Sequence, residues 1–296
     1  IYRLLNKKIR FAVENKADLF HLYGLYDQTF KDNSAKFTYQ DWIQEIESKM
    51  LPDIGETIRF VEAMPLKPIF SVVMPTYNTD EEYLRECIAS VIHQSYPYWE
   101  LCIADDNSSK PHVIQVLDEH AQVDDRIKIV KRSANGHISK ATNSAIEVAT
   151  GDYIVLLDHD DTISEHALYF IAERINQCPE AKIIYSDEDK IDEEGNRSNP
   201  HFKSDWNPDL FFSQNYVSHL GVYKTEIVKK ISGFRPGVEG SQDQDLLLRC
   251  LPHVKNSEIH HIPRILYHWR MTEGSTALAS GEKSYTTESG IKALQD

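Results

Sequence analysis

From residue 70 onward, short apolar runs alternate with amphipathic segments, and this pattern limits the fold more than any other feature. Residues 70–74 (FSVVM) read as a buried strand, and further strands are expected at residues 101–104, 127–130, 153–157 and 182–185. Between them, apolar residues recur at helical spacing at Leu84, Cys87, Ile88, Val91 and Ile92, and helices are expected at residues 141–149 and 167–175. Strands that alternate with helices predict an α/β fold with a mainly parallel sheet covered on both faces.

Composition and charge restrict the partners. The chain has a formal net charge of −14, with 41% hydrophobic and 26% charged residues, which is typical of a soluble globular protein. So acidic a surface repels phosphate backbones, and nucleic acid is therefore excluded as a main partner. Any site for a phosphate group would need local cations or a metal ion. The four cysteines show no CxxC spacing, so the sequence indicates neither a zinc site nor a disulfide framework.

The domain organisation is predicted in three parts. Residues 1–66 form a helical extension, residues 67–276 the α/β domain, and residues 277–296 a tail that could lead to a further domain. We find no apolar run of transmembrane length and no signal-peptide pattern, so a cytoplasmic protein is expected. Lys7, Lys8 and Arg10 lie beside aromatic residues, which suggests peripheral contact with the inner face of the cell membrane. A solvated helix face is the alternative, and we favour it.

The most specific motif is the acidic cluster that closes the fourth strand, Leu156-Leu-Asp-His-Asp-Asp161. Burying charge beside a sheet is costly, so a purely structural role is hard to justify. If the strand stays extended, Asp158 and Asp160 point to the same side and could share one Mg²⁺ or Mn²⁺. His268 follows the strand expected at residues 261–266 and could add a ligand or a phosphate contact, although a lone histidine is more often structural.

The ends of the first two strands carry candidate nucleotide contacts. Pro75, Tyr77 and Asn78 follow the first strand, where the tyrosine could stack on a base. Asp106 follows the second strand, where a carboxylate could accept a hydrogen bond from a pyrimidine ring N–H or from a ribose. The alternative is that these residues only form turns and helix caps, as Pro, Asn and Asp commonly do.

Two expected helix starts carry further candidates. Lys140 lies in the first turn of one helix and could hold phosphate together with the helix amides, although a solvated lysine is nearly as plausible. Ser241 and Gln244 have capping-box spacing, which would place Asp243 in a first helical turn. The helix dipole there favours an ionised carboxylate able to accept a proton. Asp243 could equally serve only to complement the dipole.

Taken together, five motifs in this order resemble the inverting family-2 glycosyltransferases of the GT-A fold: PTYN, DDNSS, LLDHDD, GSQDQDLLLR and YHWR. The similarity is strongest to bacterial enzymes that build O-antigens and other surface polysaccharides of the cell envelope. It extends from about residue 70 to residue 276, and segments 185–189 and 215–221 support it.

The resemblance implies a role for each candidate residue. Pro75, Tyr77 and Asp106 would contact the base and ribose, and Gly221 would lie near the donor sugar. With Asn78, Lys140 and Asp158 they make up the set of residues expected to bind the nucleotide sugar. Asp158 and Asp160 match the family's DXD motif, with Asp160 the more direct metal ligand, and His268 matches a histidine that helps to hold metal or diphosphate. Asp243 matches the general base. Gln242 replaces a glutamate that usually contacts the acceptor.

The implied reaction transfers a sugar from a nucleotide diphosphate to a hydroxyl of a glycan or lipid-linked glycan, with Mn²⁺ or Mg²⁺ as cofactor. UDP or dTDP is favoured if Asp106 reads a pyrimidine. The sequence leaves three alternatives. Asp158 and Thr162 also fit the D-x-D-x-T signature of haloacid-dehalogenase-type phosphatases, which normally closes a first strand. A nucleotidyltransferase would need a glycine-rich loop that the chain lacks, and a catalytically silent domain of a larger polymerase stays open.

Overall fold

The structure is a computed structural model, and it describes residues 37–271 and 285–295. The chain divides into two compact units, residues 1–51 and 52–296. The prediction for Lys7, Lys8 and Arg10, and that of helical structure in residues 1–36, lie outside the described residues. The predicted domain boundaries at residues 66 and 276 stay predictions. Within the described ranges, no helix combines the length and the apolar character needed to cross a membrane.

The described part of the first unit is helical, as its sequence predicts. It runs through α3 (Tyr39–Trp42), a π-helical stretch (Ile43–Glu47) and α4 (Ser48–Met50). The Thr38 hydroxyl accepts the backbone N–H of Asp41, whose carboxylate accepts the backbone N–H of Thr38. This reciprocal capping fixes where the helix begins.

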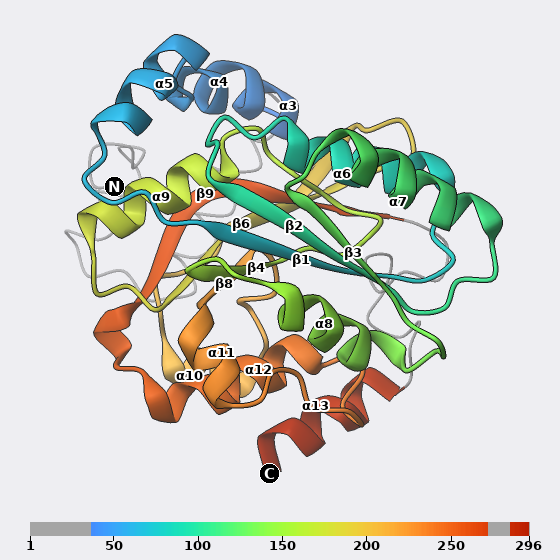
Figure 1. Ribbon diagram of the computed structural model, residues 1–296. Helices are drawn as coiled ribbons and strands as arrows, with labels where there is room; N and C mark the ends of the chain where they lie inside the picture. The colour runs from blue at the N-terminus through green and yellow to red at the C-terminus, as the bar shows by residue number, and fades with distance from the viewer. Residues whose placement is uncertain (1–36, 272–284, 296) are drawn as a thin grey trace. The chain divides into compact units, whose positions relative to one another are not determined.

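The second unit is built on a nine-stranded sheet with the order β3-β2-β1-β4-β8-β6-β9-β5, with β7 paired to β6 (Figure 1). The pairs β3/β2, β2/β1, β1/β4 and β6/β9 are parallel, whereas β8 lies antiparallel between β4 and β6. Six strands therefore point the same way, and only β5, β7 and β8 oppose them. The strands are β1 (Phe70–Thr76), β2 (Trp99–Asp105), β3 (Ile127–Lys131), β4 (Tyr153–Leu156), β5 (Thr162–Ile163), β6 (Ile183–Ile191), β7 (Arg197–His201), β8 (Gly221–Lys224) and β9 (Ile259–Arg270).

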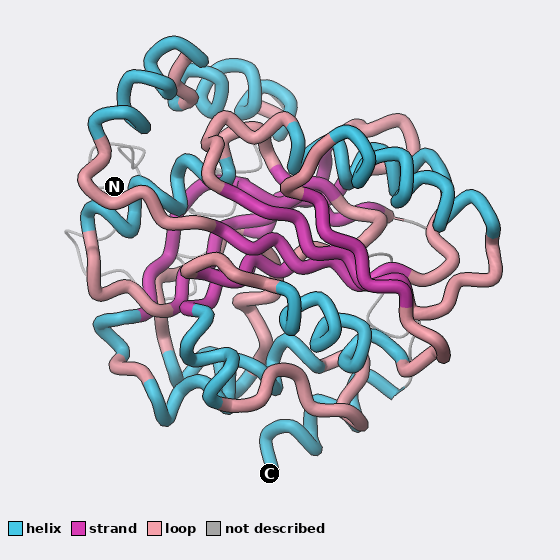
Figure 2. Tube along the Cα trace, viewed as in Figure 1, coloured by secondary structure: helices cyan, strands magenta, loops and turns pink. Residues whose placement is uncertain are grey.

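Helices cover both faces of this sheet (Figure 2). Side chains of β1 alternate between two apolar cores, because successive residues of a strand point to opposite faces. Val72 and Met74 enter the core under α6, α7 and α9, whereas Val73 enters the core under α8, α11 and α12. The helices of this unit are α5 (Ile54–Ala63), α6 (Glu81–Ile92), α7 (Pro111–Val123), α8 (His137–Val148), α9 (Ala167–Gln177), α10 (Pro208–Ser213), α11 (Thr225–Lys230), α12 (Gln242–Cys250) and α13 (Tyr285–Gln295), with two 3₁₀ turns at Leu251–His253 and Asn256–Glu258.

The predicted α/β class with a mainly parallel, doubly covered sheet is confirmed, although several local details differ. The spacing of Thr79 and Glu82 is typical of a capping box, but helix α6 is capped by Asp80, whose side chain accepts the Glu82 N–H, and the Thr79 hydroxyl pairs instead with Thr76. Helix α8 begins at His137, four residues earlier than expected. Both differences lie at helix ends, and α8 begins after Gly136 without a side-chain cap.

One buried carboxylate connects three elements at the amino ends of the central strands. Glu100 on β2 accepts hydrogen bonds from Ser71 on β1, from Lys128 on β3, and from the backbone and hydroxyl of Thr150 before β4. Burial by itself would raise the pKa of Glu100, but these hydrogen bonds outweigh it and lower the pKa to about 2. The ionised carboxylate therefore stabilises the register of neighbouring parallel strands.

We predict that Glu100→Gln lowers the free energy of unfolding at pH 7 by about 2 kcal/mol. The folded-state pKa lies below the ordinary value of 4.5, so this stabilisation is complete above about pH 4.5 and is lost as the pH falls toward 2. Urea unfolding of both proteins between pH 2.5 and 7 should show a difference that shrinks with acidity. The exposed control Glu147→Gln should follow the wild type, and a difference independent of pH would contradict the assignment.

Candidate functional site

The carboxyl ends of β1 and β2 and the start of α8 enclose a pocket of about 310 Å³. Such crevices beyond the carboxyl ends of parallel strands are where ligands bind in open α/β sheets. The predicted residues Pro75, Tyr77 and Asp106 all line this pocket, and Tyr77 is 46% exposed. The remaining lining residues are Thr76, Asn135, His137, Ile138, Ala141 and His159.

Asp106 shapes this pocket through its partners. Its buried carboxylate accepts a hydrogen bond from Arg132 Nε at 2.8 Å and from the Gly136 backbone N–H at 2.9 Å. The Arg132 guanidinium also donates to the Lys140 carbonyl and to the Ser144 hydroxyl. Asp106 therefore holds the loop between β3 and α8 against the end of β2, and the pocket wall depends on this ion pair.

Two of the predicted nucleotide contacts lie outside the lining of this pocket. The Asn78 side-chain oxygen accepts the backbone N–H groups of Ser109 and Lys110, and thereby ties the loop after β1 to the loop after β2. The Lys140 side chain is exposed in the first turn of α8. Their proposed contacts with the nucleotide and phosphate stay predictions.

The acidic motif after β4 forms a turn and does not continue as an extended strand. β4 ends at Leu156, and the Asp161 N–H donates to the Asp158 carbonyl. The condition under which Asp158 and Asp160 would point to one side is therefore not met. Instead, ligand atoms of Asp158, Asp161 and His219 lie within 4.8 Å of one another.

Distant segments hold this turn in place. The Asp161 carboxylate accepts the Tyr267 hydroxyl and the Arg270 backbone N–H, both from β9. The Tyr267 ring stacks on His219 with centroids 4.5 Å apart. The Arg270 guanidinium donates to the Asp160 carbonyl. Asp161 thus fixes the position of the turn that carries Asp158 and Asp160.

The donor set of this turn fits a hard divalent cation. Burial, followed by the charges of Asp160 and Asp158, raises the pKa of Asp161 well above its ordinary value, because negative charge in the turn is poorly compensated. Carboxylate oxygens are the ligands that Mg²⁺ and Mn²⁺ prefer, and one imidazole suits Mn²⁺ also. Asp158, Asp160, Asp161 and His219 could therefore hold such an ion.

Asp243 lies beside this turn. Together with Asp158, Gln242 and Pro75 it lines a small cavity that adjoins the first pocket, since Pro75 and Ile138 line both. From the sequence, the dipole at the start of α12 is expected to determine the ionisation of the Asp243 carboxylate. Instead, burial and then the charge of Asp158 raise the pKa of Asp243 to about 6, which leaves the carboxylate mostly ionised at neutral pH but more basic than an ordinary aspartate.

The capping box predicted at the start of α12 does not form. Ser241 occupies the N-cap position, but its side chain makes no capping hydrogen bond. The Gln242 side-chain oxygen instead accepts the Gly240 N–H, and its amide donates to the Asp243 carboxylate. Asp245 is buried and forms ion pairs with Arg235 and Arg249.

His268 and Gly221 lie in different surroundings. The His268 imidazole Nδ1 is 2.5 Å from the Asp189 carboxylate, and the side chain lines another pocket of about 350 Å³ together with Glu86 and Arg270. Its proposed contact with metal or diphosphate stays a prediction. Gly221 begins β8, two residues after His219, and a side chain there would meet the Tyr223 ring at 3.0 Å.

A buried ion pair supports the segment that carries His219. The Lys203 ammonium donates hydrogen bonds to the Glu188 carboxylate and to the carbonyls of Val217 and His219. The Glu188 carboxylate also accepts the backbone N–H of His219 at 3.0 Å. Burial lowers the pKa of Lys203, and although burial would raise that of Glu188, the lysine charge and His201 bring it to about 2. The pair is therefore charged and fixes the backbone of His219.

Sequence reasoning missed three contributors to this region: Arg132, His219 and Tyr267. Arg132 directly follows β3, and so occupies the same kind of strand-end position as Asp106 and Asp158. His219 belongs to a segment in which only Gly221 received a role. Tyr267 precedes His268, and because neighbours on a strand point to opposite faces, choosing His268 left out the residue that points to the acidic turn.

Comparisons with known proteins show the family to which the chain belongs. The family described as Glycosyl transferase family 2 matches residues 71–232, more than half of the chain. The O-antigen biosynthesis protein RfbC of Myxococcus xanthus is 36% identical over 295 residues, which is 99% of this chain and 22% of that protein. The uncharacterized protein y4gI of Sinorhizobium fredii is 50% identical over 242 residues, 82% of this chain and 27% of that protein. The chain thus spans about a quarter of the length of these relatives.

Solved structures share the fold. The crystal structure of S. aureus TarS 1-349 in complex with UDP has a TM-score of 0.59 at 18% identity, and covers 76% of this chain and 64% of its own. The complex of the same protein with UDP-GlcNAc has a TM-score of 0.58 at 20% identity, covering 70% and 60%. This likeness confirms the predicted GT-A fold.

Removing one partner of the buried ion pair should be costly. We predict that Lys203→Met lowers the free energy of unfolding by about 3 kcal/mol, because it leaves the Glu188 carboxylate buried without its cation. The double variant Glu188→Gln with Lys203→Met should recover a substantial part of this loss in urea unfolding. Strictly additive effects of the two substitutions would show that the residues are not coupled.

Proposed function

The chain belongs to glycosyl transferase family 2, and we propose that it transfers a sugar from a nucleotide diphosphate to a hydroxyl of a glycan-type acceptor, with inversion at the anomeric carbon. One observation carries the proposal. The pocket beside Tyr77 and Asp106 adjoins the cavity lined by Asp158 and Asp243, so a nucleotide site, an acidic turn and a basic carboxylate are contiguous.

The first pocket suits the nucleoside. Tyr77 offers an exposed ring for stacking on a base, and Pro75 and Ile138 supply apolar walls. Asp106 has lone pairs left after its contacts with Arg132 and Gly136, and can accept one hydrogen bond from a pyrimidine N–H or a ribose hydroxyl. The structural neighbour bound to UDP and UDP-GlcNAc supports a UDP or dTDP sugar as donor.

The acidic turn suits the diphosphate through a cation. When bound, Mn²⁺ or Mg²⁺ neutralises negative charge that develops on the leaving diphosphate. Asp158 and His219 would hold the ion, since their ligand atoms lie within 4.8 Å of one another and of a ligand atom of Asp161. Asp161 keeps the turn in place through Tyr267 and the Arg270 backbone. Asp160 belongs to the same turn and is proposed as a further ligand. The net charge of −14 makes such a cation necessary for binding an anionic donor.

Asp243 suits the acceptor. The acceptor oxygen attacks the anomeric carbon opposite the diphosphate, so a new C–O bond forms as the bond to the phosphate oxygen breaks. The acceptor proton passes to the Asp243 carboxylate, whose raised pKa makes it a better base than an exposed aspartate. The Gln242 amide donates to Asp243 and holds its orientation, and Gln242 would also contact the acceptor.

The biological setting follows from the relatives. RfbC is named for O-antigen biosynthesis, and chondroitin synthase of Escherichia coli is 27% identical over 213 residues, 70% of this chain and 30% of that protein. We infer an acceptor of the glycan or lipid-linked glycan type, and a role in surface polysaccharide biosynthesis on the cytoplasmic side of the membrane. A silent domain of a larger polymerase is the outcome that a failed turnover assay would support.

Asp243→Asn tests the base. It should retain nucleotide-sugar binding but lose turnover by about 100-fold or more, since a general base contributes roughly 10²–10⁴-fold. Asp209→Asn changes another aspartate in a first helical turn, that of α10, and serves as the matched control with wild-type turnover. Turnover that is unchanged in the Asp243 variant would remove the assignment.

Asp160→Ala tests the cation site. We expect it to abolish the rise in melting temperature that Mn²⁺ and UDP together give the wild type, because a ligand that binds only the folded state stabilises it by mass action. The control Asp118→Ala removes an exposed carboxylate on α7 and should keep the full rise. An equal rise in the Asp160 variant would refute its role as a metal ligand.

A further inference from the structure

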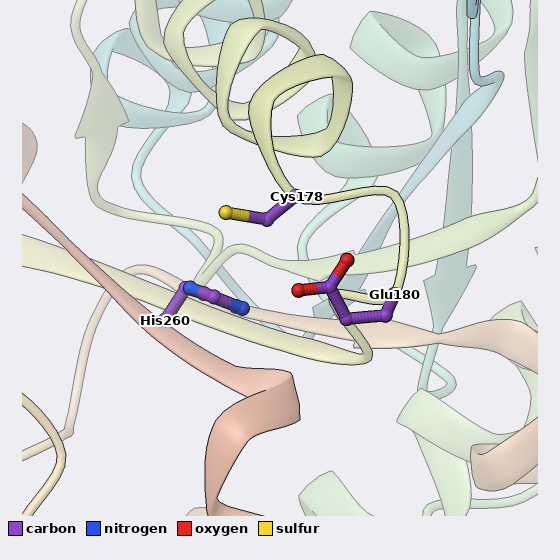
Figure 3. A group of neighbouring side chains, drawn as sticks. All are labelled: Cys178, Glu180 and His260. Atoms are coloured by element: carbon purple, nitrogen blue, oxygen red, sulfur yellow. The ribbon is translucent and has the colours of Figure 1, made fainter.

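We propose that Cys178, Glu180 and His260 form a second metal site, specific for Zn²⁺ or a similar borderline cation. One ligand atom from each residue can be chosen so that all three lie within 4.8 Å of one another. Figure 3 shows the thiol, the carboxylate and the imidazole gathered around a common space between the end of α9 and β9. None of these residues takes part in the proposed transfer reaction.

The imidazole is the strongest single observation. His260 Nε2 is buried from solvent and has no hydrogen-bond partner among the described residues. A buried polar atom without a partner costs about 1–3 kcal/mol, and native structures rarely leave one unpaired. Coordination of a cation through the Nε2 lone pair would satisfy it. The Cys178 thiol is free and half-buried, so it is available as a ligand but shielded from bulk solvent.

Local structure brings the three residues together. Cys178 ends α9, with its N–H bonded to the Arg174 carbonyl, and its own carbonyl accepts the Ala181 N–H. This tight turn places Cys178 and Glu180 close together ahead of β6. His260 lies on the neighbouring parallel strand β9, opposite Ile184. A metal ion would therefore join two segments that are about 80 residues apart in the chain.

The chemistry of the donors selects the cation. Thiolate, imidazole and carboxylate are the usual zinc ligands, with bonds of about 2.0–2.3 Å, and three protein ligands leave a fourth position for water. Ligand atoms of a tetrahedral zinc site lie roughly 3.5 Å apart, so a contraction of about 1 Å suffices. The exposed Glu180 side chain can supply this movement. Mg²⁺ avoids thiolate ligands, which distinguishes this site from the acidic turn.

The position of the site indicates a structural role. It lies at the amino ends of β6 and β9, whereas the acidic turn follows the carboxyl end of β4, which points the same way as β6. The two metal sites are therefore at opposite edges of the sheet. An ion held here would stabilise the contact of the α9–β6 turn with β9 and would not enter the transfer reaction.

Co²⁺ titration of the metal-free full chain tests the proposal. We expect one equivalent to produce a thiolate-to-cobalt charge-transfer band, which Zn²⁺ abolishes and a large excess of Mg²⁺ does not. The band should be absent in Cys178→Ser, and His260→Ala should weaken binding at least 10-fold. Zn²⁺ should raise the melting temperature of the wild type by several degrees, and of neither variant.

Two controls separate this proposal from the proposed function. His253→Ala removes another partly buried histidine, in the 3₁₀ turn Leu251–His253, and should titrate like the wild type. Asp160→Ala should keep the cobalt band even though it loses Mn²⁺-dependent nucleotide binding. Absence of a band in the wild type, or a band that persists in Cys178→Ser, would overturn the second metal site and leave the transferase assignment untouched.

Discussion

Buried carboxylates that are held by donors from distant segments are the constraint on which this structure depends. Three such carboxylates lie at the carboxyl edge of the sheet or beside it: Asp106, Asp161 and Glu188. The cost of removing each from water is offset by a hydrogen bond or ion pair from elsewhere in the chain, donated by Arg132, Tyr267 and Lys203 respectively. Because an unpaired buried charge costs several kcal/mol, these contacts fix the loops that carry them. The rigidity of the loops is thus a consequence of the charge that they bury.

The same constraint explains why the site is acidic and yet suited to an anionic donor. Positive partners neutralise Asp106 and Glu188, whereas burial and the neighbouring charges of Asp160 and Asp158 raise the pKa of Asp161, because no cation among the described residues offsets the repulsion between these carboxylates. A cation bound at that turn would relieve this repulsion, and the adjoining Asp243 has a pKa of about 6, which lies in the range useful for proton transfer. Structural and functional carboxylates differ in what surrounds them.

The sequence predicted the strands and the polar residues that follow them well, because the spacing of apolar residues and the polar residues at a strand end are both local features of the chain. It placed Pro75, Tyr77, Asp106, Asp158 and Asp243, and the structure brings all five to one edge of the sheet. It could not foresee that the chain turns after Leu156, so that Asp161 and not Asp160 lies with Asp158. That turn is set by hydrogen bonds from β9, more than 100 residues away.

The sequence by itself determined the fold class, the family and the edge of the sheet where chemistry can occur, since these follow from the periodicity and order of motifs. Only the tertiary structure decided which side chains are neighbours. His219 lies beside Asp158 and Asp161, Lys203 holds the segment that carries His219, and Cys178 lies beside His260. These contacts join segments that are distant in the chain, and no local sequence pattern predicts them. Residue identity is local information, but burial and pairing arise only when distant strands align.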